Sequence, residues 1–149
     1  KGRSVTYLAN NIFRLDNAGK LKADEGYHIE GTLVEVSMVK SRSSGRKMGT
    51  RLVFDFDNGF DPWLSLLRFM QDRKLTYGGG VSMSFDPEKT FKFSQGSFRE
   101  MVLTNPEFRD GFLKAILPHL KATPTYHKDE VMDLHLDALL NSPDIYSVA

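Results

Sequence analysis

The chain has 149 residues, a formal net charge of +1 at pH 7, 40% hydrophobic and 26% charged residues, and no cysteine. These values suit one globular domain or two small ones; they indicate no overall basic surface, and they exclude disulfide scaffolds, thiolate metal sites and cysteine nucleophiles. Because no apolar run approaches 18 residues, we expect no transmembrane helix, and no secretory leader is visible.

The first half of the chain predicts strands. Residues 5–15 are typical of a strand, after which residues 16–19 predict a turn and residues 20–25 a charged connector. Residues 34–39 and 52–56 alternate in polarity, as half-buried strands do. The polar segment between them is short, so we expect these two strands to pair as an antiparallel hairpin.

The second half begins with a predicted helix. Asp61 suits the N-cap position and Pro62 the first helical position. The apolar stripe of this helix would be Trp63, Leu66, Leu67 and Met70. Alternating residues over 81–85 and 91–93 then predict a second, small hairpin.

Two further helices are expected towards the end of the chain, after a capping box that begins at Ser97. Thr104 or Asn105 would cap the first of them, and Pro118 is expected to kink or shorten it. Residues 129–140 predict the last helix. We expect most of the aromatic residues of this half to fill its core.

Metal sites are not expected. Residues 55–61 superficially resemble a calcium loop, but an EF-hand needs glycine at its sixth position and glutamate at its twelfth. This chain has Phe60 and Leu66 there. The four histidines are spread out, without a pair on one helix face, so the sequence does not predict a zinc site either.

The residues with the clearest chemistry end the first alternating strand, in the sequence Val39-Lys40-Ser41-Arg42-Ser43. Side chains at positions i and i+2 of a strand point to the same side, so Lys40 and Arg42 would form a pair of cations suited to gripping a phosphate. The loop that follows adds Arg46 and Lys47 and contains no acid. A solvated hairpin loop is the alternative interpretation.

The order of a strand, V-K-S-R-S, a basic loop, a strand, F-D-x-G-x-D-P-aromatic at residues 56–63 and a helix resembles the carboxyl-terminal part of RecA-type recombinases, most closely the UvsX recombinases of T-even-like phages. The resemblance is clearest over residues 31–67 and 105–110. It implies an α/β fold in which residues 1–58 are the terminal strands of a RecA-like ATPase core sheet, including the antiparallel hairpin. Residues 59–149 would form a small α+β carboxyl-terminal domain.

The resemblance also implies a function. The parent recombinase would form a helical filament on single-stranded DNA and exchange strands with a homologous duplex, using ATP and Mg²⁺, in the cytoplasm of a phage-infected bacterium. Lys40 and Arg42 would act in trans on the terminal phosphate of ATP held by the neighbouring subunit. The candidate DNA contacts are Lys1, Arg3, Arg46 and Lys47.

No G-x-x-x-x-G-K-[ST] phosphate loop occurs in the sequence. ATP and Mg²⁺ are therefore expected only in the parent assembly with Walker-containing subunits, and we expect no ATP hydrolysis by this chain alone. These features favour a piece of a longer recombinase, with no membrane partner. Two alternatives stay open: a stand-alone nucleic-acid-binding module, and an interaction protein that docks on a full-length recombinase.

Overall fold

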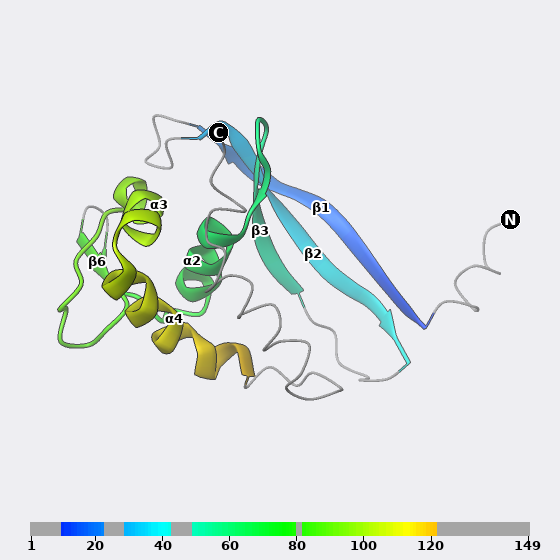
Figure 1. Ribbon diagram of the computed structural model, residues 1–149. Coiled ribbons are helices and arrows are strands. Elements are labelled where there is room, and N and C mark those ends of the chain that lie inside the picture. Colours follow the sequence, from blue (N-terminus) through cyan, green and yellow to red (C-terminus); the bar gives the residue numbers. More distant parts are fainter. Residues whose placement is uncertain (1–9, 23–28, 43–48, 80–81, 122–149) are drawn as a thin grey trace, which may run out of the picture.

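The computed structural model describes residues 10–22, 29–42, 49–79 and 82–121. This part of the chain is a mixed α/β structure with a four-stranded antiparallel sheet, a two-stranded sheet and three helices. The helices lie on one side of the larger sheet, and the first two strands extend beyond them as a long ribbon (Figure 1).

The larger sheet follows the order of the chain. Its strands are β1 (Asn11–Leu21), β2 (Gly31–Ser41), β3 (Gly49–Asp55) and β4 (Gly59–Asp61), and neighbouring strands are antiparallel. The hairpin expected between the two alternating segments is therefore confirmed as the pair β2–β3. Residues 43–48, which connect these strands, lie outside the described residues.

The turn predicted at residues 16–19 is wrong, because β1 continues through it to Leu21. A β-bulge between Asn17 and Gly19 absorbs the turn-like sequence while the pairing with β2 is kept. Gly19 has a backbone φ of 146°, which residues other than glycine rarely adopt. The Asn17 side-chain oxygen accepts hydrogen bonds from the Gly19 N–H and the Thr32 hydroxyl, so the polar residues of this segment stabilise the bulge.

The buried face of the sheet is not the face that the alternation of apolar residues indicates. Leu33 and Val53 are cross-strand partners with exposed fractions of 8% and 0%, and they lie under the helices. Their neighbours Val34 and Leu52, on the opposite face, are only half-buried. The face with Val34 and Leu52 is the more apolar one, but the helices cover the face with Leu33 and Val53, so alternation alone could not select the buried face.

The helix α2 (Pro62–Asp72) begins as predicted, with Asp61 as its N-cap. The Asp61 carboxylate accepts a hydrogen bond of 2.8 Å from the Leu64 N–H, and Trp63, Leu67 and Met70 are buried as expected. The Ser65 hydroxyl donates to the Asp61 carbonyl oxygen and accepts from the Val53 N–H at 2.9 Å, so it fastens the first turn of α2 to β3.

The division of the chain after residue 58 stays a prediction. The strand β4 follows that position directly and pairs with β3, which precedes it. Strands on either side of the proposed division therefore belong to the same sheet.

The second hairpin differs from the expected one. It pairs β5 (Tyr77–Gly79) with β6 (Ser82–Ser84), and the predicted pairing further along the chain is reduced to one bridge between Met83 and Phe93. The Asp86 carboxylate accepts hydrogen bonds from the Ser84 hydroxyl and from two backbone N–H groups of the following loop. These bonds hold the segment as a loop rather than as a strand.

The capping box predicted at Ser97 lies one turn earlier. The helix α3 (Gln95–Thr104) has Ser94 as its N-cap, and Ser97 occupies the third helical position of the box. Asn105 caps α4 (Pro106–Lys121), as predicted, by accepting a hydrogen bond from the Phe108 N–H at 3.1 Å. Pro118 lies inside α4, which continues beyond it. The last predicted helix, over residues 129–140, lies outside the described residues.

A cluster of aromatic rings forms the core around α3 and α4. Phe98, Phe108 and Phe112 have no exposed surface, and the ring centres of Phe98 and Phe112 are 4.9 Å apart. The members of this phenylalanine cluster are Phe85, Phe91, Phe93, Phe98, Phe108 and Phe112. The expectation that aromatic residues fill the core of the second half is confirmed for these side chains except Phe91, which is partly buried and packs against the core.

Candidate functional site

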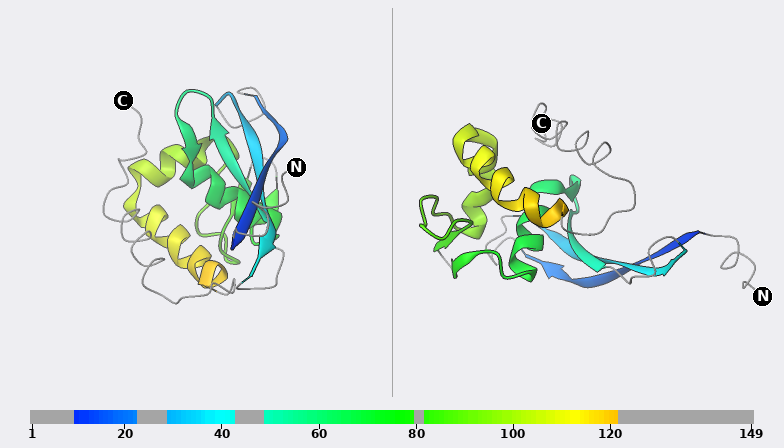
Figure 2. Two further views of the ribbon diagram at one scale, coloured as in Figure 1. Left: turned by 90° about the vertical axis from the view of Figure 1, so that its right-hand side faces the viewer. Right: turned by 90° about the horizontal axis from the view of Figure 1, so that it is seen from below.

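Lys40 and Arg42 lie at the end of β2 that is farthest from the helices (Figures 1 and 2). Lys40 is half-buried and pairs with Ile12 of β1. Arg42 is exposed, and its backbone N–H donates a 3.0 Å hydrogen bond to the Asn10 carbonyl oxygen, which extends the antiparallel pairing past the end of β2. Both predicted phosphate contacts are therefore positioned by the tip of the β1–β2 ribbon.

A β-bulge immediately precedes the two cations. Ile12 pairs with Lys40 whereas the next residue, Phe13, pairs with Met38, so Val39 is an extra residue on β2. Bulges re-aim the side chains that follow them and occur next to functional sites. The sequence alternation gave no sign of this irregularity.

The other predicted contacts are not described by the structure. Lys1, Arg3, Arg46 and Lys47, the candidate DNA-binding residues, lie outside the described residues. Their role stays a prediction, as does the contact of Lys40 and Arg42 with a nucleotide.

Asp55, at the end of β3, has structural partners. Asp55 is buried, and its carboxylate oxygens accept hydrogen bonds from the Asp57 N–H at 3.0 Å and the Asn58 side chain at 2.8 Å. Gly59 has a φ of 83°, a conformation that favours glycine, and completes the turn. The F-D-x-G-x-D-P segment at residues 56–62 therefore builds a strand exit and a helix cap.

Asp61 adds a longer-range contact to this cap. One of its carboxylate oxygens lies 3.1 Å from Nε of Arg99 on α3, and its side chain is 5% exposed. Burial raises the pKa of Asp61 above the ordinary 3.8, although the Leu64 N–H and the Arg99 charge act in the opposite direction. Asp61 and Arg99 are far apart in the sequence, so no local pattern could have revealed this pair.

The face of the larger sheet turned away from the helices carries a continuous set of apolar side chains. Cross-strand partners place Phe13, Leu15, Val34, Val36, Met38, Leu52, Phe54 and Phe60 on this face, here called the open sheet face. Exposed fractions reach 54% for Phe13, 59% for Leu15 and 47% for Phe60. The helices α2, α3 and α4 of the described chain lie on the other side of the sheet (Figure 2). Exposed apolar patches of this kind mark interaction surfaces.

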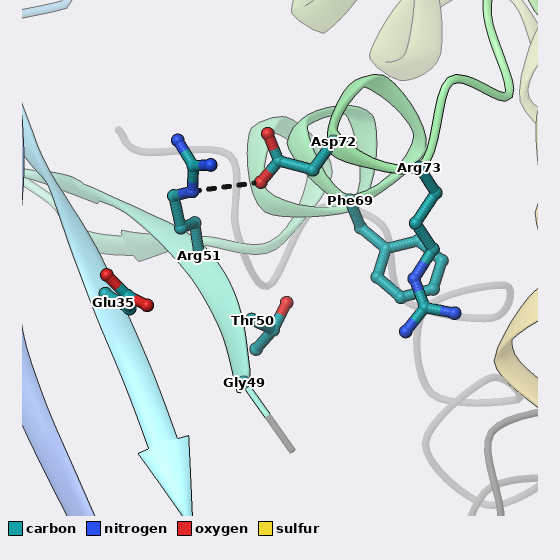
Figure 3. Close-up of a pocket in the computed structure, with 7 residues that line it drawn as sticks. All are labelled: Glu35, Gly49, Thr50, Arg51, Phe69, Asp72 and Arg73. Atoms are coloured by element: carbon teal, nitrogen blue, oxygen red, sulfur yellow. Dashed lines mark ion pairs between the residues drawn. The ribbon is translucent and has the colours of Figure 1, made fainter. Parts of the chain in front are cut away.

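A polar cavity of about 290 Å³ lies on the opposite face, between the β2–β3 pair and the end of α2 (Figure 3). Nε of Arg51 lies 3.2 Å from one oxygen of Asp72, and Nε of Arg68 lies 3.0 Å from the other. The guanidinium group of Arg73 stacks on the ring of Phe69, 4.2 Å from its centre. The lining residues are Glu35, Gly49, Thr50, Arg51, Phe69, Asp72 and Arg73.

Sequence analysis did not find this cavity. The lining residues come from separate elements, β2, β3 and the end of α2, so no local pattern connects them. A signal existed in hindsight: the cavity is rich in charge at the point where α2 ends, and arginine at a helix end is favoured by the helix dipole.

Within residues 10–22, 29–42, 49–79 and 82–121, no group of three or more histidine, cysteine or acidic side chains could hold a metal ion. Among the same residues, no helix combines the length and the apolar character needed to cross a membrane.

No protein-family model matches the chain, and no curated protein matches its sequence.

Proposed function

We propose that the chain is the carboxyl-terminal part of a UvsX/RecA-type recombinase, which coats single-stranded DNA as a filament and exchanges strands with duplex DNA at the expense of ATP. The observation that carries the proposal is the position of Lys40 and Arg42. The two residues that the resemblance assigns to a neighbour's nucleotide lie at the tip of a ribbon, beyond the helices of their own chain.

Lys40 and Arg42 would act electrostatically. Bound ATP supplies a terminal phosphate on which negative charge develops during hydrolysis. An ammonium group and a guanidinium group brought in from a second chain neutralise that charge, and the guanidinium can donate two parallel hydrogen bonds to phosphate oxygens. Because the cations and the phosphate belong to different chains, the contact also stabilises the interface between subunits.

The chain fits this role only as one contributor to a composite site. Its sequence has no phosphate loop, and its described residues hold no metal-binding cluster. The backbone N–H groups that cradle ATP and the ligands of Mg²⁺ would come from a Walker-containing subunit. This chain would contribute the two cations and the surface that carries them.

The open sheet face supports the idea that the described sheet adjoins further protein. A sheet that ends as a long ribbon with phenylalanine and leucine exposed on one face is incomplete as a hydrophobic core. In a RecA-like arrangement, the remainder of the ATPase core would cover this face.

The same face favours a second candidate function. An interaction protein that docks on a full-length recombinase would also need an exposed apolar surface, and the open sheet face provides one. The two candidates differ in their effect on ATP turnover: a missing part restores it, whereas a competing partner lowers it.

The test combines this chain with the Walker-containing part of a UvsX-type recombinase that lacks its own carboxyl-terminal part. We expect DNA-stimulated ATP hydrolysis to appear in the mixture, and Lys40→Ala or Arg42→Ala to lower it by roughly 100-fold or more. Lys20→Ala is the matched control, because Lys20 is exposed at the opposite end of the same ribbon. Turnover that is absent from every mixture, or equal in all four chains, would overturn the proposal. Inhibition of an intact recombinase by the chain would instead establish the docking function.

A further inference from the structure

We propose that the cavity beside α2 binds one unstacked base of a single DNA strand, with the adjoining phosphate at Arg51. The inference rests on the proposed function only in taking DNA as the polymer. None of the cavity residues belongs to the phosphate-contact pair or to the predicted DNA contacts, so this is a separate site on the chain.

The size of the cavity suits a base rather than a whole nucleotide. Its volume of about 290 Å³ is just below the range for small-molecule sites, roughly 300–1,000 Å³. The walls come from β2, β3 and the end of α2 (Figure 3). A flat ring can enter between the strands and the helix while its sugar and phosphate stay at the rim.

The stacking surface is the pair formed by Phe69 and Arg73. The Arg73 guanidinium lies on the Phe69 ring, and Arg73 is exposed, so the far side of its planar group is open to a ligand. Proteins that read single strands stack bases on aromatic rings and on arginine guanidinium planes. Phe69 holds the guanidinium in place, which reduces the entropy lost when a base stacks on it.

Glu35 supplies the hydrogen-bonding edge. It is exposed, lines the cavity, and makes no ion pair in the part of the chain that the structure describes. An ionised carboxylate only accepts hydrogen bonds. It therefore favours cytosine, adenine and guanine, which carry an exocyclic amino group, over thymine, whose only base donor is its ring N3–H between two carbonyl oxygens.

The charges around the cavity separate the position of the base from that of the phosphate. Asp72 is paired with Arg51 and Arg68, so with Arg73 the cavity and its border carry three guanidinium groups and two carboxylates, those of Asp72 and Glu35. The surplus positive charge is accessible at Arg51, whose side chain is 42% exposed. The carboxyl end of α2 and Glu35 disfavour an anion inside the cavity. A neutral base inside and a phosphate beside Arg51 satisfy both conditions.

The experiment measures binding of the intact chain to fluorescent twelve-residue oligodeoxycytidine and oligothymidine by anisotropy. We expect oligodeoxycytidine to bind about tenfold more tightly than oligothymidine at the same salt concentration. Glu35→Gln should remove most of this preference, because an amide can also donate to the carbonyl oxygens of thymine. Arg73→Ala should weaken binding of both oligonucleotides about tenfold through lost stacking.

Two matched controls test whether these effects belong to the cavity. Glu100→Gln and Arg14→Ala change exposed residues of the same types outside the cavity and should leave both affinities within about twofold. Equal affinity of the two oligonucleotides for the unaltered chain, or an unchanged preference in Glu35→Gln, would overturn the inference. So would equal binding of an abasic oligonucleotide, which would show that only phosphate is recognised. These readouts contain no ATP and no second protein, so the inference and the proposed function can fail separately.

Discussion

Two apolar regions, the phenylalanine cluster and the open sheet face, are buried to different degrees. Around α3 and α4, the phenylalanine cluster is sealed, with Phe98, Phe108 and Phe112 having no exposed surface. On the open sheet face, Phe13 and Phe60 leave about half of their surface exposed. Residues of the same type are thus core in one region and surface in the other.

The difference shows which region is stabilised by contacts within the described chain. Edge-to-face contacts between rings, such as the 5.2 Å pair of Phe85 and Phe108, stabilise the helical region beyond the burial of area alone. The ring of Phe54 on the open sheet face makes edge-to-face contacts with Phe60 at 5.0 Å and, more distantly, with Phe56 at 6.4 Å, and no helix of the described chain lies over this face. We infer that the helical region stabilises the fold and that the sheet face is available to a partner.

The largest expected effect comes from deleting a ring in each region. Phe108→Ala should destabilise the chain by about 3–5 kcal/mol, because it leaves a cavity in a close-packed cluster. Phe13→Ala should change the free energy of unfolding by less than about 1 kcal/mol, because its ring is largely exposed. Urea denaturation followed by circular dichroism measures both.

The second half of this comparison concerns binding. Phe13→Ala should weaken association with the Walker-containing part of a recombinase while the fold is kept, since interface rings cost binding energy when removed. Similar destabilisation by both substitutions would show that the open sheet face is already covered by the chain itself, and the distinction between the two regions would be lost.

A smaller effect is expected where the two regions are joined. Asp61→Ala removes the N-cap of α2 and the partner of Arg99, so we expect a loss of about 2 kcal/mol. Asp57→Ala is the control, because Asp57 is exposed and contributes only its backbone N–H to the turn. A thermal scan of the two variants beside the unaltered chain is sufficient. Equal melting temperatures for the two variants would show that the cap and the ion pair contribute nothing.

Much of the fold could be predicted from local signals. Asp61 and Pro62 predict the start of α2, and Asn105 predicts the start of α4. The alternation over residues 34–39 and 52–56 predicts a hairpin. Each of these rests on residues that act within one turn or one strand. Local signals failed where a contact with a neighbouring strand overrode them, as when β1 continued through a turn-like sequence by forming a bulge.

The candidate sites were predictable to a lesser extent. The sequence places Lys40 and Arg42 at a strand end, because charge and alternation are visible along the chain. It could not reveal the cavity, since Glu35, Arg51 and Arg73 meet only after β2, β3 and α2 have packed together. It could not identify the open sheet face either, because both faces of β2 and β3 carry apolar residues and the choice depends on where α2 lies.

The smallest expected effect is a dependence of stability on pH at the junction of the two regions. Burial raises the pKa of Asp61, so the folded chain holds a proton there at pH values where the unfolded chain has released it. The contribution of Asp61 to stability is therefore greatest below the ordinary pKa of 3.8 and declines as the pH rises through the raised value. Asp61→Asn has no such titration, so the stability of the unaltered chain relative to this variant should fall over that window and then level off.

The pKa of Asp86 is shifted in the opposite direction to that of Asp61. Burial is the largest single influence on the pKa of Asp86 and raises it, but the hydrogen bonds from Thr90, Ser84 and Phe91 together outweigh burial and lower the pKa, so the contribution of Asp86 to stability is lost as the pH falls through that lowered value. Because Asp86 is present in both chains, its effect cancels when urea denaturation of the unaltered chain and of Asp61→Asn is compared at each pH from about 3.5 to 7. A stability difference that stays constant across this range would mean that the Asp61 carboxyl titrates alike in the folded and unfolded chains. Burial beside Arg99 would then have no effect on the ionisation of Asp61.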